Sequence, residues 1–130
     1  MPRTRHPQLI CVGVLMVALA CVVSCSGSSQ GSGPSSVVKT ATGGAITVVA
    51  NDLYFDIGTI KTSPGPLTAT LVNRGAVYHT FKIEGTSLYL KTNAGQSATG
   101  TVTLRTGTYK FECTVPGHAA AGMRGKVEVG

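Results

Sequence analysis

The chain has 130 residues, and 42% of them are hydrophobic but only 5% are aromatic. Its length allows one domain at most. The formal net charge is +6, from 11 Lys and Arg against 5 Asp and Glu, but these charges are scattered singly, with no basic run and few aromatic residues between them, which excludes a nucleic-acid-binding surface.

The N-terminal segment, residues 1–24, predicts an export signal. Arg3 and Arg5 precede an apolar run from Leu9 to Val23. This run is marginal for a membrane span of about 20 residues but fits the hydrophobic region of a signal peptide. An uncleaved membrane anchor is the alternative. Removal of the signal leaves 9 Lys and Arg against 5 Asp and Glu, and this positive charge favours an acidic docking partner at most.

The apolar run ends in Val-Val-Ser-Cys, which resembles the lipobox of bacterial lipoproteins. That resemblance implies that Cys25 is acylated and becomes the first mature residue. Cys21 is a second candidate for the lipid, Ala20 could end a simple cleavage site, and Cys25 could remain an unmodified thiol. Residues 25–44 are rich in Ser and Gly and are expected to form a flexible tether. The lipid would hold the exported protein at the outer face of the cytoplasmic membrane, in the periplasm or cell envelope.

Four cysteines in an exported chain would ordinarily predict disulfides, but this chain predicts none. Cys11 and Cys21 leave with the signal, and Cys25 takes the lipid, so Cys113 has no partner. A lone thiol in an oxidising compartment is reactive unless something occupies it, and a bound metal would do so.

From residue 45 to residue 130 the sequence predicts short β-strands separated by turns rich in Gly, Pro, Asn and Ser, and no segment has helical periodicity. Eight strands are expected, at residues 45–50, 58–62, 67–73, 79–84, 87–91, 97–104, 108–113 and 126–129. Their length and spacing predict one all-β domain, an antiparallel sandwich or barrel.

Strand alternation places two metal-binding residue types in the core of this domain. Cys113 shares the inward face of its strand with Phe111, and His79 shares the inward face of its strand with Phe81. Taken singly, a buried histidine is more often hydrogen-bonded to the backbone, and a buried cysteine is usually a small apolar side chain.

The loop between the last two strands makes a metal site the better interpretation. His118 and Met123 follow Cys113 within the segment CTVPGHAAAGM, and His79 and His118 are the only histidines after the signal. One thiolate and two imidazoles form a trigonal set that suits copper, and a thioether supplies a weak, long fourth contact. Zinc also accepts Cys and two His but rarely a thioether, and a dinuclear copper site would need a second cysteine in this loop.

These segments resemble the cupredoxins, the blue copper proteins of the plastocyanin and azurin type. The matching stretches are VYHTF, GTYKFEC, CTVPGH and GMRGKVEV, and the resemblance covers nearly all of residues 45–130. It implies an eight-stranded, Greek-key, antiparallel β-sandwich or barrel. It also implies one type 1 copper ion per chain, with His79, Cys113 and His118 as equatorial ligands and Met123 as the axial ligand.

Two further details bear on this resemblance. The Cys-x4-His spacing is similar to that of the azurin-like and auracyanin-like loop, and NDLYFD at residues 51–56 is similar to an aromatic stretch of many small cupredoxins. The chain departs from the family at Thr80, where many members carry an Asn that ties the two ligand loops together. The hydrogen bonds that Thr80 makes around the ligands are therefore expected to differ from those that an Asn makes in other family members.

The resemblance implies an electron-transfer protein, expected to be a monomer, that carries single electrons between a donor and an acceptor protein. It is not expected to be an enzyme, because four ligands leave no open position and the motif holds no acid or base. A copper-binding protein for trafficking or sequestration is the alternative, and an accessory module of a larger complex is a third possibility.

Small or apolar residues surround His118 and are expected to form the surface on which redox partners dock briefly. They are Pro116, Gly117, Ala119, Ala120 and Ala121. The alternative is that a tight ligand loop simply needs small residues.

Overall fold

The computed structural model describes residues 35–130, so the export signal at residues 1–24 and both candidate lipidation sites, Cys21 and Cys25, lie outside the described residues. Within that range the chain forms nine strands and one short helix. These are β1 (Val38–Thr40), β2 (Ala45–Ala50), β3 (Thr59–Thr62), β4 (Gly65–Asn73), β5 (His79–Ile83), β6 (Tyr89–Thr92), β7 (Ser97–Leu104), β8 (Gly107–Glu112), α1 (His118–Ala121) and β9 (Arg124–Val129).

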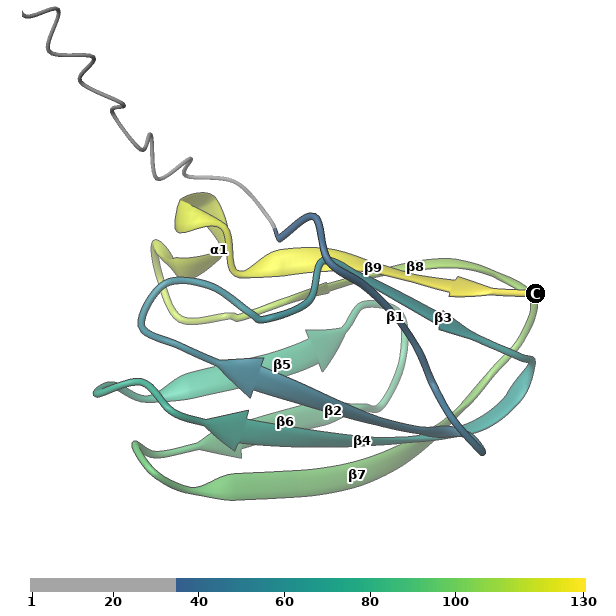
Figure 1. Cartoon of the computed structure of the whole chain (residues 1–130), viewed down its shortest axis with the longest axis horizontal. Coiled ribbons are helices and arrows are strands. Elements are labelled where there is room, and N and C mark those ends of the chain that lie inside the picture. Colours follow the sequence, from purple (N-terminus) through teal and green to yellow (C-terminus); the bar gives the residue numbers. More distant parts are fainter. Residues whose placement is uncertain (1–34) are drawn as a thin grey trace, which may run out of the picture.

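The strands form two layers, as Figure 1 shows, and this confirms the predicted all-β sandwich. The larger sheet has the order β1-β3-β9-β8-β5-β6, and the smaller sheet has the order β2-β4-β7. The predicted antiparallel pairing holds for β4 with β7, β5 with β6, β5 with β8 and β8 with β9, whereas β1 pairs with β3, β3 with β9 and β2 with β4 in parallel. Alternation of apolar residues shows which face of a strand is buried but not the direction of its neighbour.

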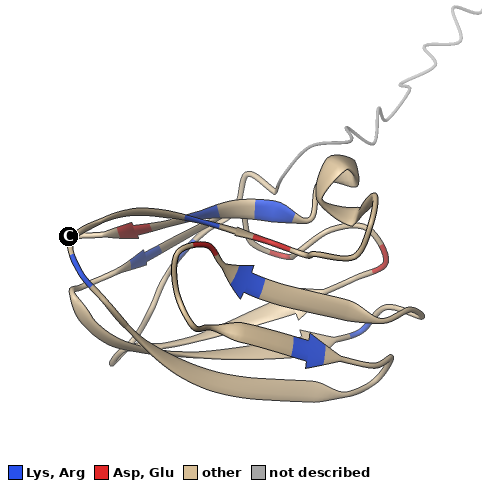
Figure 2. Ribbon diagram, turned by 180° about the vertical axis from the view of Figure 1, so that it is seen from behind, with Lys and Arg blue, Asp and Glu red and all other residues tan. Residues whose placement is uncertain are grey.

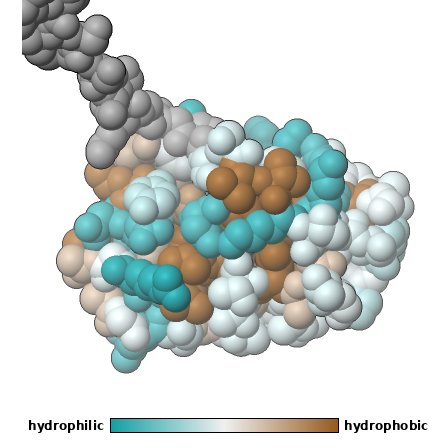
Figure 3. Space-filling model, in the orientation of Figure 1, coloured by the Kyte–Doolittle hydropathy of each residue, from teal (hydrophilic) through white to brown (hydrophobic). Residues whose placement is uncertain are grey.

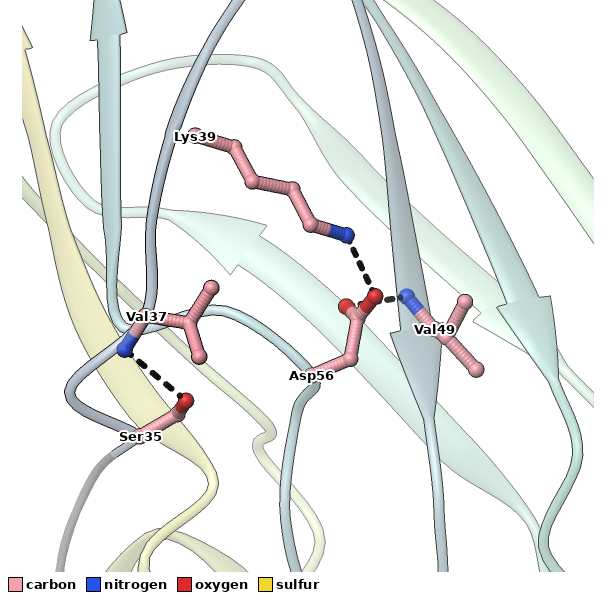
Figure 4. A network of polar contacts seen from close by, with 5 residues as sticks. All are labelled: Ser35, Val37, Lys39, Val49 and Asp56. Atoms are coloured by element: carbon pink, nitrogen blue, oxygen red, sulfur yellow. Dashed lines mark hydrogen bonds and ion pairs between the residues drawn. The ribbon is translucent and has the colours of Figure 1, made fainter.

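The eight-strand expectation missed β1, which lies inside the segment that was expected to be a tether. This strand is short and mostly exposed, so it carries no apolar pattern of its own. It is held by pairing with β3 and by the Lys39 ammonium group, which contacts the Asp56 carboxylate (Figure 4). Asp56 also accepts a hydrogen bond of 2.8 Å from the backbone N–H of Val49. The folded part therefore begins before residue 45, and β1 covers an edge of β3 that would otherwise be open.

Alternation is clearest along β4, the central strand of the smaller sheet. Leu67 and Leu71 point into the core and are fully buried. Thr68 lies on the outer face, where its hydroxyl oxygen is 2.9 Å from that of Thr101 on β7. The inner face thus supplies apolar packing while the outer face adds cross-strand hydrogen bonds.

Three buried phenylalanines form the part of the core next to the metal-binding residue types. The ring centroids of Phe55, Phe81 and Phe111 lie 5.0 to 5.8 Å apart. Phe81 comes two residues after His79, and Phe111 two residues before Cys113. Aromatic packing of this kind therefore fixes both strands that carry the candidate ligands.

The helix α1 is a single turn, too short to show the periodicity that predicts a helix. It follows Gly117, whose φ of 84° is in the left-handed region that favours glycine. Figure 1 shows α1 at the end of the sandwich opposite the C-terminus. Across residues 35–130, no helix has the length and hydropathy required to cross a membrane.

Candidate metal centre

Two paired strands of the larger sheet carry His79 and Cys113. His79 is the first residue of β5, Cys113 directly follows the last residue of β8, and β5 pairs with β8. Both side chains are buried, with exposed fractions of 0% and 1%. The inward orientation that alternation predicted for these two residues is confirmed.

Backbone hydrogen bonds close the loop from Cys113 to Met123. The N–H of Cys113 donates to the carbonyl oxygen of Met123 at 2.9 Å, and the N–H of Met123 donates to that of His118 at 3.0 Å. The two ends of the loop are thereby clamped together. Met123 is fully buried beside the end of β8, and the half-buried His118 lies between the two ends.

Three atoms that could bind a metal converge at the end of the sandwich that carries α1. Nδ1 of His118 lies 3.2 Å from Nδ1 of His79 and 3.6 Å from Sγ of Cys113. The donor atoms of all three residues lie within 4.8 Å of one another. A neutral imidazole offers one ring nitrogen as an acceptor, so two facing Nδ1 atoms and a sulfur can share a cation between them.

The pKa of His79 is lowered by burial of its ring and by the charge of His118, and the Asp52 carboxylate opposes this shift. The ring is therefore neutral at neutral pH. A neutral imidazole has a free lone pair, which metal binding requires.

The other ring nitrogen of His79, Nε2, is buried and has no hydrogen-bond partner among the described residues. It lies next to Gly75, in the loop before β5. A Cβ atom on Gly75 would lie 3.0 Å from Nε2 and 2.8 Å from Oδ1 of Asp52. A side chain at this position would therefore crowd the space between the carboxylate and the imidazole, so that one of the two groups would have to shift.

We expect Gly75→Ala to weaken copper binding about fivefold, since displacing the His79 ring introduces strain on the order of 1 kcal/mol. Competition with a chelator of known affinity measures this change. Gly130→Ala is the matched control, because a Cβ atom there meets no other atom within 4 Å. Equal copper affinity of the two variants would contradict the expectation.

Thr80, the position at which the chain departs from the family pattern, contacts Cys113 directly. Its backbone nitrogen lies 3.5 Å and its Oγ1 3.7 Å from Sγ. Oγ1 also accepts a hydrogen bond of 2.7 Å from the backbone N–H of Thr114. A threonine thus ties the start of β5 to the loop after β8, the role expected of an Asn at this position.

Sequence reasoning missed two residues of this centre, Asp52 and Thr114. Thr114 adjoins Cys113, and that adjacency is the signal by which it could have been found. Asp52 reaches the centre through the fold, where its Oδ1 accepts a hydrogen bond of 2.7 Å from the N–H of Ala76. No spacing in the sequence points to that contact.

The expected docking surface lies around α1. Pro116, Gly117 and Ala120 are exposed, whereas Ala119 and Ala121 are partly buried. Figure 2 shows no charged residue on α1, and Figure 3 shows hydrophobic side chains in separate patches on one face of the molecule. Four larger exposed hydrophobic residues lie in the two loops that Asp52 joins, and they are Leu53, Tyr54, Val77 and Tyr78.

Residues 42–130 match the copper-binding proteins of the plastocyanin/azurin family. The chain belongs to this family. Copper is therefore the metal of this plastocyanin/azurin-family protein, and the donor set of one thiol and two imidazoles fits it. A comparison with curated proteins finds no match.

Solved structures similar to this family member include three auracyanins. Reduced auracyanin from the photosynthetic bacterium Roseiflexus castenholzii gives a TM-score of 0.63 at 24% identity, over 69% of this chain and 98% of that one. Auracyanin A of Chloroflexus aurantiacus, described as a "blue" copper protein, gives a TM-score of 0.57 at 21% identity, over 71% of this chain and 100% of that one. Auracyanin B gives a TM-score of 0.56 at 26% identity, over 75% of this chain and 96% of that one.

Proposed function

We propose that the protein is a blue copper electron carrier, with His79, Cys113 and His118 as the equatorial ligands of one copper ion and Met123 as the weak axial ligand. The observation that carries this proposal is the convergence of two Nδ1 atoms and one Sγ atom within 4.8 Å. Copper bound to such a set supplies one-electron redox chemistry. The description of auracyanin A as a "blue" copper protein supports the same function.

The protein's own contribution is to hold the ligands in one geometry. Packing of Phe81 and Phe111 fixes β5 and β8, and the loop clamp between Cys113 and Met123 fixes the remaining ligands. A site that cannot rearrange lowers the cost of changing oxidation state. Burial of Cys113 also keeps water from the sulfur, while His118 is only half-buried and so lies nearer to the surface.

Burial of the thiol favours this function over copper trafficking, the alternative that the same residues allow. A copper donor needs ligands that an acceptor protein can reach, and Cys113 is only 1% exposed. Four ligands leave no open position for a substrate, so the proposal includes no catalysis. Reversible one-electron voltammetry, with no transfer of Cu(I) to a chelating acceptor, is the result expected of an electron carrier. Rapid copper handover with slow electrochemistry would favour trafficking.

The docking surface around α1 is part of this proposal, and Ala120→Asp tests it. The substitution places a charge on an exposed, apolar turn next to His118, so we expect electron exchange with the natural partner to slow several-fold. Copper content and colour should not change, because Ala120 is exposed and is not one of the residues whose donor atoms converge at the metal centre. Stopped-flow kinetics measure the rate. An unchanged rate would show that the small residues serve the tight loop only.

We also propose that the exported protein is a monomer attached to the outer face of the cytoplasmic membrane through a lipid on Cys25. The support is the lipobox-like sequence that ends at Cys25 and the Ser/Gly-rich segment after it. We expect Cys25→Ala to release the protein from the membrane fraction or to stall it as an unprocessed precursor, which immunoblotting of cell fractions measures. Normal processing and attachment of that variant would assign the lipid to Cys21 or exclude it.

A further inference from the structure

A continuous chain of hydroxyl groups runs from the protein surface to the sulfur of Cys113. Oη of Tyr89 lies 2.9 Å from Oγ1 of Thr114, which lies 2.9 Å from Oγ1 of Thr80. Oγ1 of Thr80 in turn lies 3.7 Å from Sγ of Cys113. The chain starts at a side chain that is 44% exposed and ends at one that is 1% exposed, so it connects solvent with the candidate ligand.

The chemistry of the sulfur sets the direction of the protons in this chain. A metal-bound thiolate only accepts hydrogen bonds, and each hydroxyl has one proton to donate. The O–H of Thr80 therefore points at Sγ, the O–H of Thr114 then donates to Thr80, and the O–H of Tyr89 donates to Thr114. All three dipoles have their positive ends directed toward the sulfur.

Tyr89 is held at the start of the chain by a neighbour on the same strand. Nζ of Lys91 lies 4.7 Å from the centroid of the Tyr89 ring, a cation–π contact. The contact orients the ring, and the positive charge draws electron density from the phenol, which makes its hydroxyl a better donor. Both residues belong to β6, which pairs with the strand that carries Thr80.

We propose that Tyr89 is a positioning residue for the copper centre, in that its hydroxyl acts through Thr114 and Thr80 to order the hydrogen bond received by Cys113 and so raises the reduction potential. This inference rests on the proposed function, because it requires Cys113 to bind copper as a thiolate. A donor dipole aimed at the sulfur favours the state with one more electron, and hydrogen bonds in a chain polarise one another.

Tyr89→Phe tests the proposal because it removes the hydroxyl and keeps the ring. We expect the reduction potential to shift to a lower value and the thiolate-to-copper absorption band to move to longer wavelength. Thr80→Val should shift both in the same direction and further, since it removes the group that contacts the sulfur. Tyr109→Phe is the matched control: its hydroxyl bonds only to the backbone of Arg105, and both readouts should stay at their wild-type values.

A double substitution separates the hydroxyl chain from a direct effect of the exposed phenol. In a Thr114→Val background the chain is broken, so Tyr89→Phe should cause no further shift, whereas Thr114→Ser should retain the coupling. An unchanged potential in Tyr89→Phe, or the same shift in both backgrounds, would overturn the inference while leaving the copper site intact. Absence of the band in the copper-loaded wild type would overturn the proposed function as well, so the two failures are distinguishable.

Discussion

Cys113→Ser is expected to abolish the visible colour of the copper-loaded protein while leaving its fold in place. The colour of such a centre arises from charge transfer between a thiolate and oxidised copper, and a serine hydroxyl cannot supply it. The fold should survive, because the backbone N–H of residue 113 still reaches the Met123 carbonyl, and Thr80 can hydrogen-bond the new hydroxyl. Burial of that hydroxyl should cost about 1–2 kcal/mol of unfolding free energy.

The visible spectrum after copper addition and mild oxidation measures the first effect, and circular dichroism of the metal-free variant checks the second. Thr108→Ser is the control for a small polar substitution, since Thr108 is exposed at the start of β8, the end of that strand far from Cys113. A Cys113→Ser protein with the wild-type band would show that the thiolate is not a ligand.

Gly125→Ala is expected to produce the largest loss of stability of any variant considered for this chain. Gly125 on β9 is paired with Phe111 on β8, and other atoms already occupy the place that a Cβ atom of residue 125 would take. A Cβ atom there would lie 2.4 Å from Cζ of Phe111 and 2.3 Å from the backbone oxygen of Gly58. One of these neighbours is main chain and the other belongs to the packed aromatic cluster, so neither can move aside freely.

We expect this overpacking to lower the unfolding free energy by about 3 kcal/mol. Urea unfolding of the metal-free protein measures it. Gly130→Ala, at an open position, should unfold at the same urea concentration as the wild type. If Gly125→Ala does the same, β9 is free to shift away from β8, and the packing described for this hairpin is wrong.

Alternation along single strands was enough to predict that two of the four candidate ligands are buried. His79 and Cys113 point into the core as their positions relative to Phe81 and Phe111 indicate. The same rule fails for Thr80, which lies on the opposite face of β5 from His79 but is also buried. On that face it meets Thr114, in a different segment of the chain, whose backbone N–H and hydroxyl both hydrogen-bond with Thr80 Oγ1.

Other features depend on contacts between distant segments, and no local pattern reports them. The parallel pairing of β1 with β3 is fixed by neighbours that approach in space, as is the ion pair of Lys39 with Asp56. The approach of Tyr89 to Thr114 is also a result of the folded arrangement. The family resemblance implied the fold and the ligand set, but it did not predict the hydrogen bonds around the sulfur.

The clamp between Cys113 and Met123 has a consequence for how the protein assembles. Cys113, His118 and Met123 all belong to the hairpin of β8 and β9, whose formation closes only a short loop and is therefore fast. His79 joins them only when β5 docks on β8, a contact between segments far apart in sequence. Copper affinity should thus report docking of β5, and metal added to a partly folded chain should drive that step by mass action.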